Sequence, residues 1–218
     1  MKINVLGDSI TSGGGAGGIE KGFIGVLRNI TTHEIRAYGL GGTRIARQTI
    51  PSAIPTRDND FQMRALEMEK DADYVLVFGG TNDYGHGDAK LGSFNDCSPY
   101  TFYGALHCLA KYLVETYGKE KVCFLTPLHR FNEDDPWGDV GVKKEAVAPL
   151  SKYVDAIKEI VEAYGFDLLD LYGENFIPIP STDLGDEYTI DGLHPNVKWH
   201  AKLAERIAVY LTEKSKTL

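Results

Sequence analysis

Cysteine is scarce in this sequence, and its three copies follow no pattern. Cys97, Cys108 and Cys123 are an odd number at unrelated spacings, and no Cys-x-x-Cys or Cys/His metal-binding arrangement is present. A chain of 218 residues can bury a full hydrophobic core without disulfide bridges. We therefore expect free thiols, no metal and no cofactor, in a single domain that spans residues 1–218.

Basic runs and long apolar stretches are also missing. The formal net charge is −8, and nucleic acids and anionic membranes attract basic surfaces, so neither is an expected partner. No run of about 18 apolar residues could span a membrane. The first apolar run starts at residue 2 and leaves no room for a leader peptide, which indicates a cytoplasmic protein; a chain already freed of a signal peptide would read the same way.

The sequence does contain short apolar runs that alternate with longer segments of helical periodicity. Strands are expected at 2–6, 33–38, 73–78, 121–126 and 166–171. Helices are expected at 23–30, 61–70, 99–117 (with Ser98 as N-cap) and 196–211, with another that ends at Gly165 and a helical turn within 43–50. This rhythm predicts an α/β fold with a five-stranded parallel sheet between two helical layers, in the flavodoxin-like strand order 2-1-3-4-5.

A glycine-rich loop follows the first strand. Gly13, Gly15 and Gly18 match the G-x-G-x-x-G spacing of dinucleotide-binding proteins. That fingerprint should begin where the strand ends, and an acidic residue should close the second strand, whereas Ala37 and Tyr38 stand there. No Gly-Lys-Ser/Thr follows, which excludes a P-loop. The segment is interpreted as a flexible loop beside the strand end.

A candidate nucleophile stands at the end of the first strand. Gly7-Asp8-Ser9 places a hydroxyl where open α/β sheets bind their ligands. The triplet alone is weak, because glycine, aspartate and serine are ordinary turn residues. Its significance depends on three further blocks near expected strand or loop ends: Gly39-Leu40-Gly41-Gly42-Thr43, Gly79-Gly80-Thr81-Asn82-Asp83 and Asp191-Gly192-Leu193-His194-Pro195.

These four blocks, in this order, resemble the SGNH hydrolases, also called the GDSL lipase/esterase family. The resemblance extends from Gly7 to Pro195 and implies the same fold and a serine hydrolase. A serine hydroxyl needs a base to activate it, and that base needs a group to fix its tautomer. By the resemblance, Ser9 is the nucleophile, His194 the base and Asp191 its partner; a spacing of three lets one turn present both of the latter side chains.

The resemblance also implies an oxyanion hole. Its donors would be the backbone amides of Ser9 and Gly42 and the side-chain amide of Asn82. Gly41 is the rival to Gly42, which is preferred because it directly precedes a small polar residue. The sequence departs from the family at Gly39, where members often carry asparagine.

Residues beside these groups are candidates for substrate binding, and Asp8 is also expected to order the turn. The candidates are Asp8, Thr81, Asp83 and Tyr84.

Two polar clusters allow other interpretations. Asp83, His86 and Asp88 could be imagined as metal ligands, although the glycines between them favour a solvated loop. The acidic segment around Trp137 could bind a cation or stack on a sugar, and a charged surface loop explains it equally well.

The predicted activity is hydrolysis of short acyl esters, O-acetyl groups on carbohydrates above all, through an acyl-serine intermediate. Loops 84–98, 128–142 and 172–190 are expected to overhang the site, and their aromatic residues suit a sugar better than a long alkyl chain. These aromatic residues are Tyr84, Trp137, Tyr172 and Tyr188. The same catalytic residues would serve a lysophospholipase, a thioesterase or an acyltransferase, and a non-catalytic carbohydrate-binding protein on the same fold is the alternative from another class.

Overall fold

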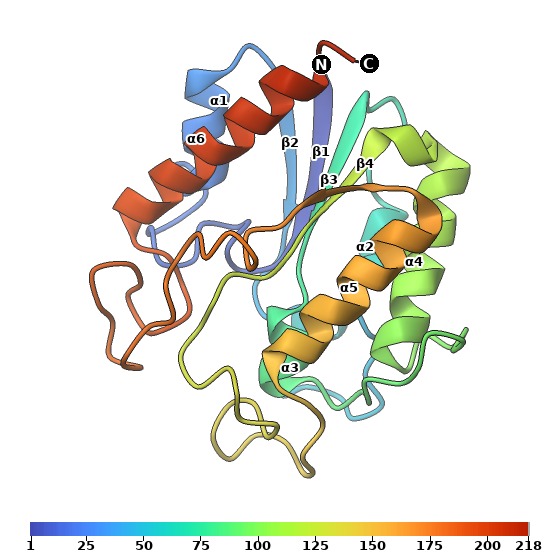
Figure 1. The fold of residues 1–218 in the computed structure, drawn as a ribbon, viewed down its shortest axis with the longest axis vertical. Coiled ribbons are helices and arrows are strands. Elements are labelled where there is room, and N and C mark those ends of the chain that lie inside the picture. The colour runs from blue at the N-terminus through green and yellow to red at the C-terminus, as the bar shows by residue number, and fades with distance from the viewer. Residues whose placement is uncertain (218) are drawn as a thin grey trace.

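A computed structural model describes residues 1–217 and contains one five-stranded sheet. Its strands, all parallel, run in the order β2-β1-β3-β4-β5, as the sequence predicted (Figure 1). They are β1 (Lys2–Gly7), β2 (Glu34–Gly39), β3 (Tyr74–Phe78), β4 (Val122–Leu125) and β5 (Asp167–Leu169).

Helices cover both faces of this sheet and make a three-layer sandwich (Figure 1). One face carries α1 (Phe23–Ile30) and α6 (Val197–Lys214). The other carries α2 (Phe61–Ala65), the short α3 (Thr81–His86), α4 (Phe102–Tyr117) and α5 (Leu150–Tyr164). Two 3-10 turns, η1 (Pro55–Asp58) and η2 (Lys119–Lys121), complete the elements. Within residues 1–217, no helix is both long and apolar enough to cross a membrane.

The core follows the period-two pattern of the strands. In β3, Val75 and Val77 pack with the helices of one layer, whereas Leu76 and Phe78 pack with α1 and α6. Because both faces of the sheet are covered, the strand reads as a continuous apolar run. Burying each such side chain stabilises the fold by roughly 1.5–3 kcal/mol before the entropy of ordering is subtracted.

Three expectations about helices were wrong, and tertiary hydrogen bonds explain two of them. Segment 43–50 contains no helix, because carboxylates from a neighbouring segment accept hydrogen bonds from its backbone amides. The second helix ends at Ala65 and not at Lys70. Beyond it, the amide of Glu69 donates to Tyr38 and its carbonyl accepts from Asn4, which replaces helical bonding.

The third correction concerns the start of α4. Thr101, and not Ser98, is the N-cap, and its hydroxyl accepts from the amide of Gly104 at 3.2 Å. Either residue type caps a helix well, so the sequence could not separate them.

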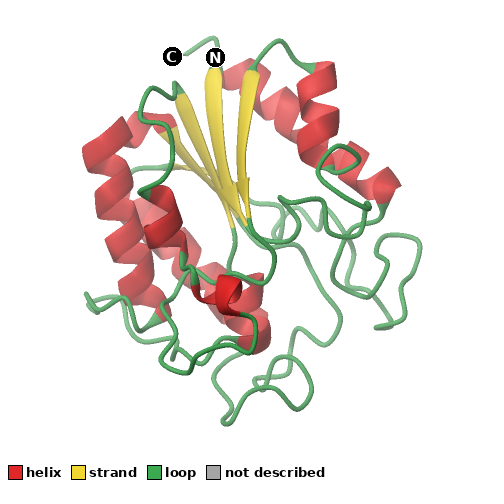
Figure 2. Ribbon diagram, turned by 180° about the vertical axis from the view of Figure 1, so that it is seen from behind, coloured by secondary structure: helices red, strands yellow, loops and turns green. Residues whose placement is uncertain are grey.

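The loops that follow the strands gather at the end of the sheet away from the two termini (Figure 2). In the register of the sheet, Gly7 at the end of β1 stands beside Gly39 of β2 and Phe78 of β3. Strand order reverses here, because the chain leaves β1 toward β2 on one side and β3 lies on the other. Such a switch point is where open α/β sheets form binding sites.

Candidate active site

The turn after β1 presents Ser9 at this edge of the sheet. Asp8, which is 2% exposed, accepts a hydrogen bond from the amide of Ile10 at 3.0 Å. Burial raises the pKa of Asp8 to about 6, although this hydrogen bond and the charges of His194 and Arg64 act in the opposite direction. The side chain of Asp8 therefore points into the protein and orders the turn, while Ser9 remains partly exposed.

Ser9, His194 and Asp191 form one hydrogen-bonded row. The Ser9 hydroxyl lies 2.8 Å from Nε2 of His194, and Nδ1 of His194 lies 2.7 Å from Oδ2 of Asp191. An ionised carboxylate can only accept, so Nδ1 carries the proton and the lone pair of Nε2 faces Ser9. This tautomer can take a proton from the serine hydroxyl.

Asp191 is held in this orientation by the short turn that the spacing predicted. Its Oδ1 accepts from the amides of His194 at 2.8 Å and Leu193 at 3.1 Å. Partial burial acts to raise the pKa of Asp191, but the hydrogen bonds from the side chain and backbone of His194 outweigh it and lower the pKa below its usual value. The carboxylate is thus kept ionised.

The glycine-rich loop lets the His194 turn approach β1. A Cβ at Gly14 would lie 2.9 Å from Cδ2 of His194, and one at Gly15 would lie 2.2 Å from the carbonyl of Pro195. Buried His200 fixes this loop, because its Nδ1 accepts from the amide of Phe23 and its Nε2 donates to the carbonyl of Gly14 at 2.8 Å. The glycines thus serve close packing, and the sequence had not singled out His200.

Three hydrogen-bond donors stand in the segments expected to form the oxyanion hole. Within residues 1–217, the backbone amides of Ser9 and Gly42 donate to no protein acceptor. Asn82 is 4% exposed, and its side-chain amide donates to the carbonyl of Thr43 at 3.0 Å, which leaves its second hydrogen available. The two candidate glycines differ in their need for glycine. Gly42 has φ +75°, a conformation that favours glycine. The rival Gly41 has room for a side chain, because a Cβ there would lie 3.8 Å from Ser9 Cβ.

Asp83 ties this donor segment to α3. Its carboxylate accepts from the amides of Ile45 at 2.9 Å and Ala46 at 2.8 Å. Burial raises the pKa of Asp83 to about 7, although both hydrogen bonds favour the charged form. Asp83 thereby holds the chain that follows Gly42 beside Asn82.

The residues expected to contact substrate lie inside the protein. Thr81 accepts from Arg130, and the Tyr84 hydroxyl donates to backbone carbonyls of the 128–142 loop. The four candidates are 1–3% exposed: Asp8, Thr81, Asp83 and Tyr84. Their placement indicates support of the site and corrects the expectation of substrate contact.

Most of the aromatic side chains that were expected to stack on a sugar make contacts within the protein. Tyr172 donates to Glu133 at 2.8 Å, and the Tyr188 ring packs against Trp199 with centroids 5.0 Å apart. Of the four aromatic side chains, only Trp137, at 49%, is largely exposed. The aromatic argument for a sugar substrate is therefore weaker than the sequence suggested.

The imagined metal ligands point to different partners. Asp83 binds backbone amides, Asp88 accepts from the amides of Thr49 and Ile50, and His86 lies between Arg44 and Asn82. No cluster of three or more metal-binding side chains occurs in the part of the chain that the structure describes. The three cysteines are free thiols.

Two cavities, which share Asp139 in their walls, lie beside the site. One of about 620 Å³ is lined by His86, the bonding partner of Asn82, and by Arg57, whose side chain covers Gly42. A smaller one of about 220 Å³ is lined by Asp191 and Leu193. Ser9 and His194 line neither cavity, so both cavities adjoin the row and do not contain it.

Fold and site together define a class of protein: an α/β sandwich with serine, histidine and aspartate in one hydrogen-bonded row at the end of the first strand. The chain belongs to the GDSL-like lipase/acylhydrolase family, whose model matches residues 5–202. The resemblance seen in the four sequence blocks is thereby confirmed.

Solved structures with the same fold cover nearly the whole chain. A protein of Lactobacillus plantarum is 27% identical, with 97% of this chain and 96% of that one covered and a TM-score of 0.76. A lipase/acylhydrolase of Enterococcus faecalis is 20% identical (99% and 97% covered, TM-score 0.62). Est24, a carbohydrate acetylesterase of Sinorhizobium meliloti, is 19% identical (97% and 98% covered, TM-score 0.61). No curated protein matches the sequence.

Proposed function

We propose that this protein is a serine esterase that hydrolyses short acyl esters through an acyl-Ser9 intermediate. The observation that carries the proposal is the unbroken row from the Ser9 hydroxyl through His194 to Asp191, at 2.8 and 2.7 Å. A hydroxyl within hydrogen-bond distance of an oriented imidazole is the arrangement that activates a serine at neutral pH.

The reaction proceeds in two halves. Ser9 Oγ attacks the ester carbonyl while its proton passes to Nε2 of His194, and Asp191 stabilises the imidazolium. The negative charge on the former carbonyl oxygen is met by the amides of Ser9 and Gly42 and the side chain of Asn82. His194 returns the proton to the leaving alcohol. Water, deprotonated by the same imidazole, then attacks the acyl-Ser9 ester, and the acid is released.

The substrate we propose is a short acyl ester, with O-acetylated carbohydrates as the leading class. The Arg57 side chain lies against Gly42, so a polar group borders the space beside the donors. The exposed Trp137 and the acidic residues of the same loop suit a hydroxylated substrate better than lipid. The Sinorhizobium meliloti neighbour, a carbohydrate acetylesterase, is compatible with this choice but shares only the fold at its level of identity.

A panel of p-nitrophenyl esters from acetyl to dodecanoyl, run beside acetylated xylo-oligosaccharides and a lysophospholipid, tests the proposal. We expect kcat/KM to fall with chain length and to depend on Ser9 throughout. Fastest turnover of the lysophospholipid or of chains of eight carbons or more would move the assignment to a lipase. Ester turnover that survives in Ser9→Ala would overturn the proposed nucleophile.

A further inference from the structure

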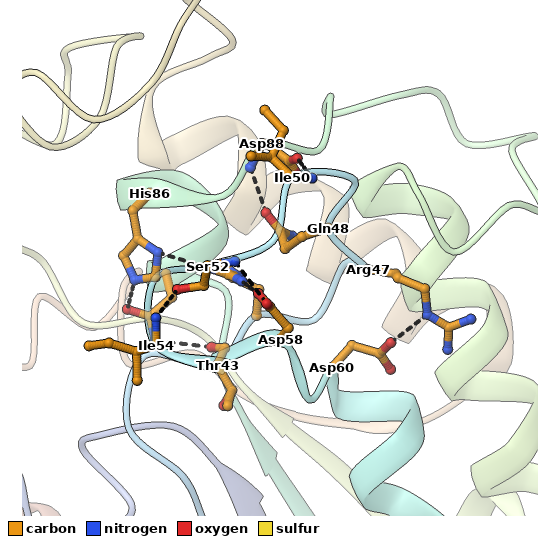
Figure 3. A network of polar contacts seen from close by, with 12 residues as sticks. Thr43, Arg47, Gln48, Ile50, Ser52, Ile54, Asp58, Asp60, His86 and Asp88 are labelled. Carbon is orange, nitrogen blue, oxygen red and sulfur yellow. Dashed lines mark hydrogen bonds and ion pairs between the residues drawn. The ribbon is translucent and has the colours of Figure 1, made fainter. Parts of the chain in front are cut away.

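A row of polar side chains continues from Asn82 through His86 and Arg44 to Asp58, and Figure 3 shows His86 and Asp58 within this network. Nε2 of His86 lies 3.2 Å from Oδ1 of Asn82, and Nδ1 of His86 lies 3.1 Å from a guanidinium nitrogen of Arg44. Another nitrogen of Arg44 donates to Asp58 at 2.7 Å. The row joins residues from η1, the loop after β2, and α3.

The direction of each hydrogen bond in this row follows from chemistry. A guanidinium has only donors, so Nδ1 of His86 must accept, and the ring proton therefore stands on Nε2. Nε2 then donates to Asn82, which identifies the atom facing it as the amide oxygen. The Asn82 nitrogen faces the opposite way, where it donates to the carbonyl of Thr43 at 3.0 Å.

The surroundings of His86 keep the imidazole neutral. Burial, followed by the charge of Arg44, lowers the pKa of His86 to about 4, with smaller contributions of the same sign from Arg57 and Arg130 and an opposing one from Asp139. The neutral ring retains the acceptor that Arg44 requires. The orientation of the row is thus the same across the neutral pH range.

We propose that His86, held by Arg44 and Asp58, is a positioning residue that fixes the Asn82 amide with its N–H groups toward the oxyanion. This inference rests on the proposed esterase function. An amide rotated by half a turn would present its carbonyl oxygen to the developing negative charge and would repel it. Preorganised donors contribute because they need no reorientation during the reaction.

Two substitutions at position 86 distinguish the effect of the hydrogen-bond donor on this side chain from the effect of packing. The amide of His86→Gln supplies one acceptor and one donor, as the neutral imidazole does. The carboxylate of His86→Glu keeps the acceptor for Arg44 but has no donor for Asn82, so the Asn82 amide would turn its nitrogen toward residue 86. Gln62→Glu is the control, because it adds the same charge on α2, outside the cavity and without contact with Asn82.

We expect His86→Glu to lower kcat by about 10–100-fold with little change in KM, because the lost interaction strengthens only in the transition state. His86→Gln and Gln62→Glu should stay within a few-fold of wild type, and thermal unfolding should show all three folded. Equal activity of the Glu and Gln variants at position 86 would overturn the inference. Ser9→Ala is assayed in parallel, because residual turnover there would overturn the esterase proposal itself and not the role of His86.

A separate observation concerns the charge in the 620 Å³ cavity. Its wall carries four cationic and three acidic side chains, but two of the acids are engaged: Asp88 with the amides of Thr49 and Ile50, and Asp139 with Arg130. The cationic side chains are Arg44, Arg57, Lys143 and Lys144. Of these, Arg44 is paired with Asp58.

Arg57 stands out because its guanidinium has no hydrogen-bond or carboxylate partner within residues 1–217. It also lies beside the oxyanion donors, since a Cβ on Gly42 would be 2.6 Å from Arg57 Nε. Lys143 likewise meets only neutral oxygens, the carbonyl of Asp83 and the hydroxyl of Tyr153, at 3.2 Å each. The wall thus carries one more cationic than acidic side chain, four against three, in a protein of net charge −8.

We infer that, among esters whose acyl group is longer than acetyl, this cavity selects those with a carboxylate at the far end of the acyl group, with Arg57 as the specificity-determining residue. The leaving oxygen must face His194 to receive its proton, so the alcohol lies on the imidazole side of the carbonyl carbon. The acyl group then extends away from the imidazole, past Gly42 toward Arg57. A carboxylate there forms a charge-assisted hydrogen bond with the guanidinium.

Umbelliferyl adipate half-ester and umbelliferyl hexanoate, which have acyl chains of equal length, provide the test. We expect wild type to favour the adipate, and Arg57→Gln to lower its kcat/KM by about 10–100-fold with the hexanoate little changed, as expected for a charge-assisted contact. Arg57→Lys should restore part of the preference. A wild-type preference for hexanoate, or an equal effect of Arg57→Gln on both esters, would overturn this inference and leave the esterase proposal standing.

Discussion

The two halves of the site differ in how the protein holds them. The side chains of His194 and Asp191 are 23% and 42% exposed, and they stand on a surface turn that precedes α6. Asn82 is 4% exposed in a short helix, and its neighbour Asp83 binds the backbone of the facing segment. One half is a local turn at the surface, and the other is a buried contact between distant segments.

This difference matches what each half has to do. In the proposed mechanism the imidazole exchanges a proton with hydroxyl, alcohol and water, and access to solvent favours that exchange. Stabilising an oxyanion needs donors that are already aimed and do not relax, and a dry environment makes their interaction stronger. We therefore expect substitutions in the exposed half to affect chemistry alone, and those in the buried half to affect chemistry and folding together.

The largest effect should come from the exposed half. Ser9→Ala and His194→Ala should each lower kcat by about 10⁴–10⁶-fold, because no other group can replace the nucleophile or its base. Urea unfolding should show both variants close to wild type in stability. A destabilisation of several kcal/mol in either variant would contradict the separation of the two halves.

The next effect is in the buried half. Asn82→Ala should lower kcat by about 10²–10³-fold with a much smaller change in KM, because the contact strengthens as negative charge develops. The same variant loses the bond to the carbonyl of Thr43, so its unfolding free energy should fall by about 1–3 kcal/mol. Unchanged stability would show that Asn82 has no structural role.

A smaller effect distinguishes the two adjacent glycines. Gly42→Ala forces alanine into a positive φ of 75° and places its Cβ against Arg57. We expect kcat to fall by about tenfold from this backbone strain beside the donors. Gly41→Ala is the control, since its Cβ has room at 3.8 Å from Ser9 Cβ. Greater damage from Gly41→Ala would reassign the oxyanion donor to Gly41.

The smallest effect is on the pH dependence of stability. Asp8 and Asp83, with pKa values of about 6 and about 7, hold protons in the folded protein that the unfolded chain has already released. Their contribution to stability is complete below about pH 4 and is lost as the pH rises toward 7. The pKa of Asp191 is lowered, so its contribution to stability is present at neutral pH and is lost on acidification.

We therefore expect the unfolding free energy of wild type to decrease between pH 4 and 7, by up to about 1.4 kcal/mol per pH unit for each of these two carboxyl groups. Asp83→Asn should flatten this slope, and Asp191→Asn should not. Parallel slopes for wild type and Asp83→Asn would show that Asp83 is ionised throughout and is held by the amides of Ile45 and Ala46.

The exposed half was predictable from the sequence, and the buried half only in part. Local signals suffice for Asp191 and His194, whose spacing makes one turn, and the apolar run before Ser9 defines its strand. The burial of Asp83 and the position of His86 between Arg44 and Asn82 depend on segment 43–50 folding against α3. No local pattern encodes that packing, so the sequence alone indicated a loop, or metal ligands, at these residues.

The most direct test of the account is to identify the residue that becomes acylated. The protein is treated with a fluorophosphonate, and intact mass and peptide mapping measure the extent and the position of labelling. We predict one label per chain on Ser9, none in Ser9→Ala, and much slower labelling in His194→Ala. A label on another residue, or an unlabelled protein that still hydrolyses esters, would contradict the assignment of Ser9 as the nucleophile.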